Sequence, residues 1–238
     1  MSDPGTLALL LLLGTWAALD GTALAQFMIS RPLVSGTLAG WILGDPATGL
    51  IVGGTLEAAH LGELPAGGTR LPEPGPAAVP AVAAAVQLGG VGGIAAGLAL
   101  GAGWSLLGGA TVIGQRRLNG RMTLGIEEEG AAARTVALRH WGCIALDALR
   151  GCLVTGAGLI AAATVVGWMG DGQGSLGQLA PGRVGEGEFG LQVLPPILLL
   201  PGALAAGALL RGWSPSLRRA ALFIAGLVAG VLIAGVAS

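Results

Sequence analysis

Residues 33–57 read LVSGTLAGWILGDPATGLIVGGTLE and place an acid and a proline in the middle of an apolar run. Gly44-Asp45-Pro46 cannot continue a helix cleanly, because proline lacks an N–H donor and clashes with the preceding turn. The pieces on either side, Leu33–Gly44 and Ala47–Leu56, are each about 15 to 18 Å long as helices. A bilayer core is about 30 Å thick, so neither piece crosses it. The stretch therefore predicts a re-entrant helical hairpin, whose polar turn must be buried in protein or line a cavity.

The composition of the whole chain is typical of a membrane protein. Of 238 residues, 53% are hydrophobic and 11% are charged, which is more apolar surface than a soluble domain of this size can bury. The formal net charge of −1 is neither strongly basic nor strongly acidic, so the charge balance does not point to nucleic acid as a partner. Cys143 and Cys152 lie in one apolar segment without other ligating side chains, which favours neither a disulfide nor a metal site. We expect an all-α polytopic membrane protein.

The N-terminal apolar segment has two interpretations. Ala23-Leu24-Ala25 has the small-residue form of a signal-peptide cleavage site. However, the chain begins Met1-Ser2-Asp3 without the positive charge that a signal peptide needs, and Asp20 lies just before the supposed site. We therefore predict that Thr6–Leu24 is a retained first span, close to the roughly 20 residues that a bilayer requires.

The rest of the chain divides into further spans and connections. Residues 57–76 hold charged side chains among glycines and prolines and predict a loop close to the membrane. The next apolar run is too long for one crossing, and Gly89-Gly90-Val91-Gly92-Gly93 is its natural break. The segments expected from there on are a half-length helix, Ala77–Leu88, and the spans Ile94–Ile113, Gly142–Met169, Leu191–Leu210 and Ala220–Val236.

Charge predicts on which side the connections lie. Gln115–His140 carries five arginines and, by the positive-inside rule, predicts an irregular cytoplasmic loop. The glycine-rich residues 170–190 carry one arginine against three acids, which fits the outer face. We expect one membrane-embedded domain over residues 1–238. Its parts are a first span and hairpin region (1–113), the cytoplasmic loop (114–140) and the C-terminal spans (141–238).

Polar side chains near the helix breaks are the candidate site. Half-helix ends and unwound backbone at membrane depth are where many transporters bind polar substrates, and an ionisable residue in the membrane is a functional candidate by default. Carboxylate and amide groups suit a sugar, because each hydroxyl both donates and accepts. The candidates on this ground are Asp20, Gln26, Ser30, Arg31, Asp45 and Glu57.

Structural roles are the alternative for several charged residues. Arg31 and Glu57 form an ion pair in one reading of the hairpin. Asp147 and Arg150 are three residues apart on one helix face, which favours an intrahelical pair over a substrate role. His60 lies near a predicted membrane boundary, and a structural histidine is favoured there.

Two segments resemble a known family. Residues 26–34, QFMISRPLV, and residues 44–57, GDPATGLIVGGTLE, are similar to motifs of the membrane-embedded IIC component of sugar phosphotransferase systems of the mannose/fructose/sorbose family. Residues 61–69, LGELPAGGT, resemble the glycine-containing turn that follows in that family. The specific part of the resemblance covers about residues 20–80, and beyond it the similarity is one of layout.

The resemblance implies a sugar-translocating subunit in the bacterial inner membrane, without catalytic residues, cofactor or metal. It implies a IID membrane subunit and cytosolic IIA and IIB components that relay phosphate from phosphoenolpyruvate, and we expect a homo-oligomer. The substrate-binding residues carried over are Gln26, Arg31, Glu57, Gly67, Gly68, Thr69 and Glu73, to which the helix breaks add Asp20 and Ser30.

Two other functions stay open at this point. One is a non-transporting regulatory or assembly protein that signals through phosphotransferase partners. The other is a small-solute permease that works without a phosphotransferase system. Neighbouring genes for IIA and IIB components would favour transport, and the absence of all such genes would favour the independent permease.

Overall fold

The structure is a computed structural model that describes residues 3–24, 26–61, 72–124 and 133–170. Within these ranges the chain is helical with short turns and contains no β-strand, as expected for an all-α protein. The helices are α1 (Pro4–Thr22), α2 (Pro32–Ile42), α3 (Pro46–His60), α4 (Pro74–Leu88), α5 (Gly90–Thr123) and α6 (Ala133–Gly170). The predicted spans Leu191–Leu210 and Ala220–Val236 and the predicted outer connection lie outside the described residues.

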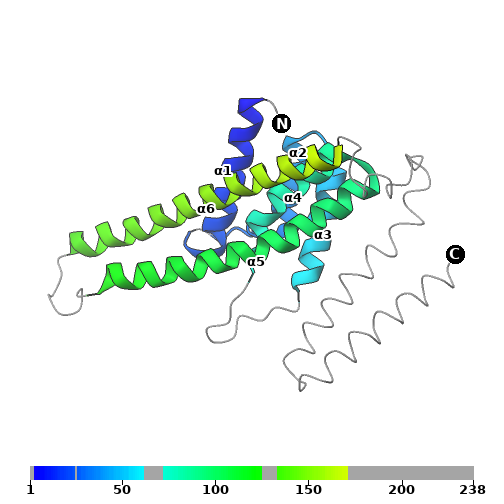
Figure 1. Cartoon of the computed structure of the whole chain (residues 1–238). Coiled ribbons are helices and arrows are strands. Elements are labelled where there is room, and N and C mark those ends of the chain that lie inside the picture. Colours follow the sequence, from blue (N-terminus) through cyan, green and yellow to red (C-terminus); the bar gives the residue numbers. More distant parts are fainter. Residues whose placement is uncertain (1–2, 25, 62–71, 125–132, 171–238) are drawn as a thin grey trace, which may run out of the picture.

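The short helix α4 forms the core. Its residues from Gly75 to Ala85 are all buried, and they are alanine, valine, proline and glycine. A helix that is apolar all round is stable where other elements surround it. Helices α1, α2, α3, α5 and α6 each contact α4, and Figure 1 shows it among them. Every other described helix is therefore placed with respect to this one.

Helices α2 and α3 form the predicted pair of short helices. Gly44 turns the chain with φ of 84°, and the Asp45 carboxylate caps α3 by accepting from the Thr48 N–H at 2.9 Å. The two backbones approach closely. A Cβ on Gly49 would lie 2.5 Å from the Gly36 carbonyl oxygen. Small residues at this contact allow the hairpin to form with almost no side chain between its arms.

The predicted break between α4 and α5 is confirmed. Gly89 and Gly90 have φ of 68° and 61°, a left-handed conformation that residues with a Cβ rarely adopt. Helix α5 then returns along α4, and a Cβ on Gly93 would lie 2.6 Å from the Ala85 carbonyl oxygen. The corner therefore starts α5 at Gly90 rather than at Ile94, and α5 packs directly on the core helix.

The prediction of an irregular loop over Gln115–His140 is wrong for most of its length. Helix α5 continues to Thr123, and α6 already begins at Ala133. Figure 1 shows the two as long antiparallel helices side by side. Arg139 on α6 donates to the carbonyl oxygens of Met122 (3.2 Å) and Leu124 (2.9 Å), which stabilises the end of α5. The arginines of residues 115–140 mark where the apolar surface of α5 and α6 ends, but the two helices continue through this region.

The predicted loop over residues 57–76 is also shorter in the structure. Helix α3 extends to His60, and Glu57 within it accepts a hydrogen bond from the Leu33 N–H at the start of α2. Helix α4 begins at Pro74 rather than at Ala77, since a proline in the first helical turn loses no hydrogen bond.

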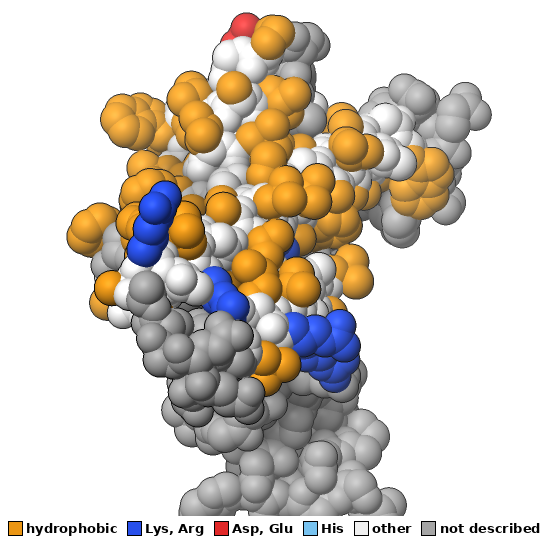
Figure 2. Space-filling model, turned by 90° about the vertical axis from the view of Figure 1, so that its left-hand side faces the viewer, with side chains coloured by type: hydrophobic (Ala, Val, Ile, Leu, Met, Phe, Trp, Pro, Cys, Tyr) orange, Lys and Arg blue, Asp and Glu red, His pale blue; other side chains and the backbone are white. Residues whose placement is uncertain are grey.

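Three of the described helices, α1, α5 and α6, are long and apolar enough to cross a membrane, which agrees with three of the predicted spans. Large apolar side chains on their surfaces are exposed, with Leu12 at 66% and Ile160 at 71%. Figure 2 shows a face covered largely by hydrophobic side chains, with basic side chains gathered below them. This surface is suited to lipid rather than to water.

The close contact of α2 and α3 gives the first prediction. Gly49→Ala would remove the usual penalty of a helical glycine, about 0.5–1 kcal/mol, but would add an overpacking cost of about 1–3 kcal/mol. We therefore expect a lower thermal midpoint for the purified variant in detergent. Gly103→Ala is the matched control, because nothing lies within 4 Å of its added Cβ. Equal thermal midpoints for Gly49→Ala and Gly103→Ala would contradict the close contact between α2 and α3.

Candidate functional site

Asp20 holds the segment that follows α1. Its side chain is 2% exposed and accepts hydrogen bonds from the Phe27 N–H and from the Ser30 N–H, the latter at 2.9 Å. On either side of Phe27, the backbone of Gln26 and Met28 has positive φ, 54° and 67°. Non-glycine residues adopt this conformation at a cost, so a compact turn is imposed by its surroundings. Asp20 therefore shapes the segment 26–31, while the Gln26 side chain is exposed.

The same segment lies directly on the start of α4. The Ser35 hydroxyl of α2 donates to the Gly75 carbonyl at 2.8 Å, and a Cβ on Gly75 would overlap the Ser30 carbonyl. Only glycine fits at this crossing. Ser30 is thereby fixed beside the first turn of the core helix.

Arg31 and Glu57 form the ion pair that was one alternative for them. Glu57 also accepts from the Leu33 N–H at 3.4 Å, so the carboxylate joins α3 to the start of α2. The Glu57 side chain is 14% exposed and the Arg31 side chain 51%. The pair therefore secures the hairpin and still presents a guanidinium at the surface.

A second group of polar side chains forms a buried network near the end of α1 and the start of α4. Arg150 on α6 binds Glu73 with two parallel hydrogen bonds of 2.6 and 2.8 Å, and it donates to Asp147 at 2.8 Å. The Thr22 hydroxyl at the end of α1 donates to the second oxygen of Asp147. Arg150 also donates to Thr111 on α5 at 3.1 Å. The network therefore joins α1, α5 and α6 to the start of α4.

The expected Asp147–Arg150 pair is thus confirmed, but its main partner was missed. Glu73 and Arg150 are 77 residues apart in the chain, and no local pattern connects them. His60 has the structural contacts expected of it. Its Nδ1 lies 2.7 Å from the Leu56 carbonyl oxygen and its Nε2 lies 3.3 Å from the Ser105 hydroxyl.

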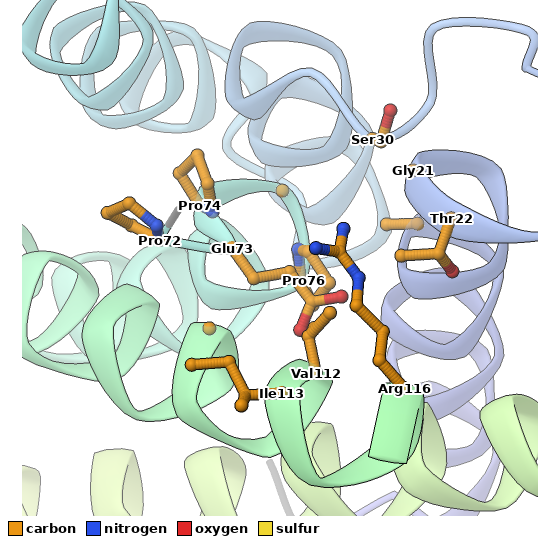
Figure 3. Close-up of a pocket in the computed structure, with 13 residues that line it drawn as sticks. Gly21, Thr22, Ser30, Pro72, Glu73, Pro74, Pro76, Val112, Ile113 and Arg116 are labelled. Atoms are coloured by element: carbon orange, nitrogen blue, oxygen red, sulfur yellow. The ribbon is translucent and has the colours of Figure 1, made fainter. Parts of the chain in front are cut away.

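A cavity of about 230 Å³ lies beside this network. Four parts of the chain line it: the last two turns of α1, Ser30, residues 72–76 and the stretch 109–116 of α5. Figure 3 shows the side chains of Glu73 and Arg116 among those that line it. The volume is slightly below that of typical small-molecule sites, about 300–1,000 Å³. The cavity has room for a small polar ligand.

The structure places the predicted site residues in two groups. Ser30 and Glu73 line the cavity, and Asp20 holds Ser30 in place. Gln26, Arg31 and Glu57 are not among the lining residues. The remaining predicted residues, Gly67, Gly68 and Thr69, lie outside the described residues. The sequence did not predict Thr22, Arg116 and Arg150 as site residues. For Arg116, the only sequence feature that drew attention to it was the cluster of arginines in the predicted loop.

Comparison with known proteins assigns the family. The family model described as "PTS system sorbose-specific iic component" (EII-Sor) matches residues 6–170, which include α2 to α6 and all of α1 except its first two residues. The chain belongs to this family. The match of this IIC chain begins in the first turn of α1 and ends with α6, so the hairpin, the buried network and the cavity all lie inside it.

Curated relatives match parts of this IIC chain. The mannose-specific EIIC component of Escherichia coli K12 is 39% identical over 80 residues, 34% of this chain and 29% of the relative. The sorbose-specific EIIC component of Klebsiella pneumoniae is 30% identical over 132 residues, which are 55% of this chain and 49% of the relative. The N-acetylgalactosamine permease IIC component 1 of E. coli K12 is 49% identical over 51 residues, which are 21% of this chain and 19% of the relative. The matched part thus spans between about a fifth and a half of these relatives.

A solved structure shares the fold of this IIC chain. The structure described as "Structure of membrane protein" has a TM-score of 0.56 over 98% of this chain and 96% of its own. Its sequence identity of 22% supports the fold alone.

The buried network gives the second prediction. Arg150→Met would leave Glu73 and Asp147 close together without their cation, a change that costs about 3–5 kcal/mol for a buried pair. We expect a large fall in the thermal midpoint of the purified protein. Combining it with Glu73→Gln and Asp147→Asn removes the stranded charges, and we expect most of the loss to be regained.

Arg134→Met is the matched control for this test, because Arg134 is an exposed arginine on the same helix. A fall in midpoint as large for Arg134→Met as for Arg150→Met would contradict the role of the network.

Proposed function

We propose that this chain is the sugar-translocating IIC subunit of a phosphoenolpyruvate-dependent phosphotransferase system. Membership in the IIC family carries the proposal, since the matched residues contain the broken-helix hairpin and the cavity. The chain translocates the sugar and performs no phosphoryl transfer, which belongs to separate IIA and IIB components. It spans the bacterial inner membrane several times and works with a IID subunit, as part of a homo-oligomer.

The geometry supports two groups of sugar-binding residues. Ser30 and Glu73 line one cavity, where the carboxylate of Glu73 suits the hydroxyl groups of a sugar. Gln26 and the exposed guanidinium of Arg31 offer further hydrogen-bond donors on the segment next to it. Asp20 and Glu57 act mainly by holding that segment and the hairpin in position. Gly67, Gly68 and Thr69 are assigned to the site by the family resemblance alone.

The position of these groups suggests how binding is linked to movement. The segment 26–31 is held to α1 by Asp20 and to the start of α4 by the Ser30–Gly75 contact. A sugar that binds Ser30 and Glu73 therefore touches both the hairpin side and the long helices at once. Because a ligand shifts a conformational equilibrium only through differential contacts, a site at this junction is well placed to do so.

The third prediction is a transport test. Cells that co-express this chain with a IID subunit and the cytosolic components are expected to take up one of three radiolabelled sugars, sorbose, mannose or N-acetylgalactosamine. Gln26→Ala and Glu57→Gln are expected to reduce that uptake by about tenfold, the equivalent of 1.4 kcal/mol. Gln115→Ala is the control, because that amide bonds Asn119 on the same helix.

Three results would count against the proposal. Absence of uptake in the parent strain contradicts sugar translocation and favours a regulatory or assembly role. Uptake without the phosphotransferase components favours an independent permease. Normal uptake by both Gln26→Ala and Glu57→Gln contradicts the assignment of these residues, although not the transport function.

A further inference from the structure

The wall of the cavity that α5 contributes ends in a charged side chain. Gly109, Val112, Ile113 and Arg116 line the cavity, and their spacing of three, four and seven residues places them on one face of the helix. Arg117 follows Arg116 by about 100° around the helix and is not among the lining residues. The register of α5 therefore directs Arg116 to the cavity, as Figure 3 shows, and places Arg117 on another face of the helix.

The two charged residues of the cavity lining differ in how they are paired. Both carboxylate oxygens of Glu73 accept hydrogen bonds from Arg150. The Arg116 guanidinium, in contrast, makes no hydrogen bond or ion pair to any residue that the structure describes. Arginine carries five N–H donors and no acceptor. The cavity lining thus holds one unused set of donors, and a carboxylate that already accepts two hydrogen bonds and has acceptor capacity left.

The surrounding charges favour an uncharged ligand. Arg150 and Arg116 together carry two positive charges, against which stand the acids Glu73, Asp147 and Asp20 close to the cavity. An anion would lie near three carboxylates, and a cation near Arg116 would meet a like charge. Hydroxyl oxygens accept from a guanidinium without adding charge.

We propose that Arg116 is a further sugar-binding residue of this cavity, and that it donates to hydroxyl oxygens of the uncharged sugar. This inference rests on the proposed function and makes it more specific. It adds a residue from α5, on the far side of the cavity from Ser30, so that the ligand contacts α5, the start of α4 and the segment after α1 together.

The test measures equilibrium binding to the full chain purified in detergent. Radiolabelled sorbose, mannose and N-acetylgalactosamine are the probes, and mannose 6-phosphate is added as a charged competitor. We expect Arg116→Gln to weaken binding of the uncharged sugar by tenfold or more, whereas Arg117→Gln leaves it unchanged. The thermal midpoint of Arg116→Gln should equal that of the parent, because Arg116 is exposed and unpaired within the described chain.

Each outcome decides the inference separately from the transport proposal. Unchanged affinity in Arg116→Gln overturns it, even if uptake is normal. An equal effect of Arg116→Gln and Arg117→Gln on sugar affinity overturns it as well, since the effect would then not depend on which arginine lies at the cavity. Preferred binding of mannose 6-phosphate overturns the uncharged class. Absence of binding by the parent overturns the cavity as a sugar subsite, while transport itself is judged by uptake.

Discussion

The buried guanidinium of Arg150 is the contact on which the arrangement of the described helices depends. Its donors are divided between Glu73 at the start of α4, Asp147 on α6 and Thr111 on α5. A buried cation is costly unless its donors are used, so these helices must meet in one position. Because Thr22 binds Asp147, the end of α1 is held there too. The cavity lies where these elements converge.

Features that depend on a few neighbouring residues could be predicted from the sequence. The hairpin turn needs a residue that accepts positive φ, a side chain that caps the next helix and a proline in its first turn, and Gly44-Asp45-Pro46 supplies all three in order. The corner at Gly89 and Gly90 is a signal of the same local kind. Asp147 and Arg150 could be paired because helical spacing alone brings them together.

Features that depend on distant parts of the chain could not be predicted in this way. The partner of Arg150 at Glu73 comes from tertiary packing, and the cavity is lined by segments from three helices and a turn. The charges of residues 114–140 mark where the apolar surface ends, which was mistaken for the end of the helices. From the sequence alone Arg116 is a marker of sidedness, whereas the register of its helix places it at the cavity.

The contact between α2 and α3 is made mainly by main-chain atoms, since Gly36, Gly40, Gly49 and Gly53 face one another across it. Such an interface has few rotamers to exchange, and its fit depends on backbone positions that change only together. We therefore expect the two arms to move as one rigid body. In the proposed transport function, a rearrangement that exposes the sugar to the other side of the membrane would therefore be taken up at the edges of this unit, rather than between its arms.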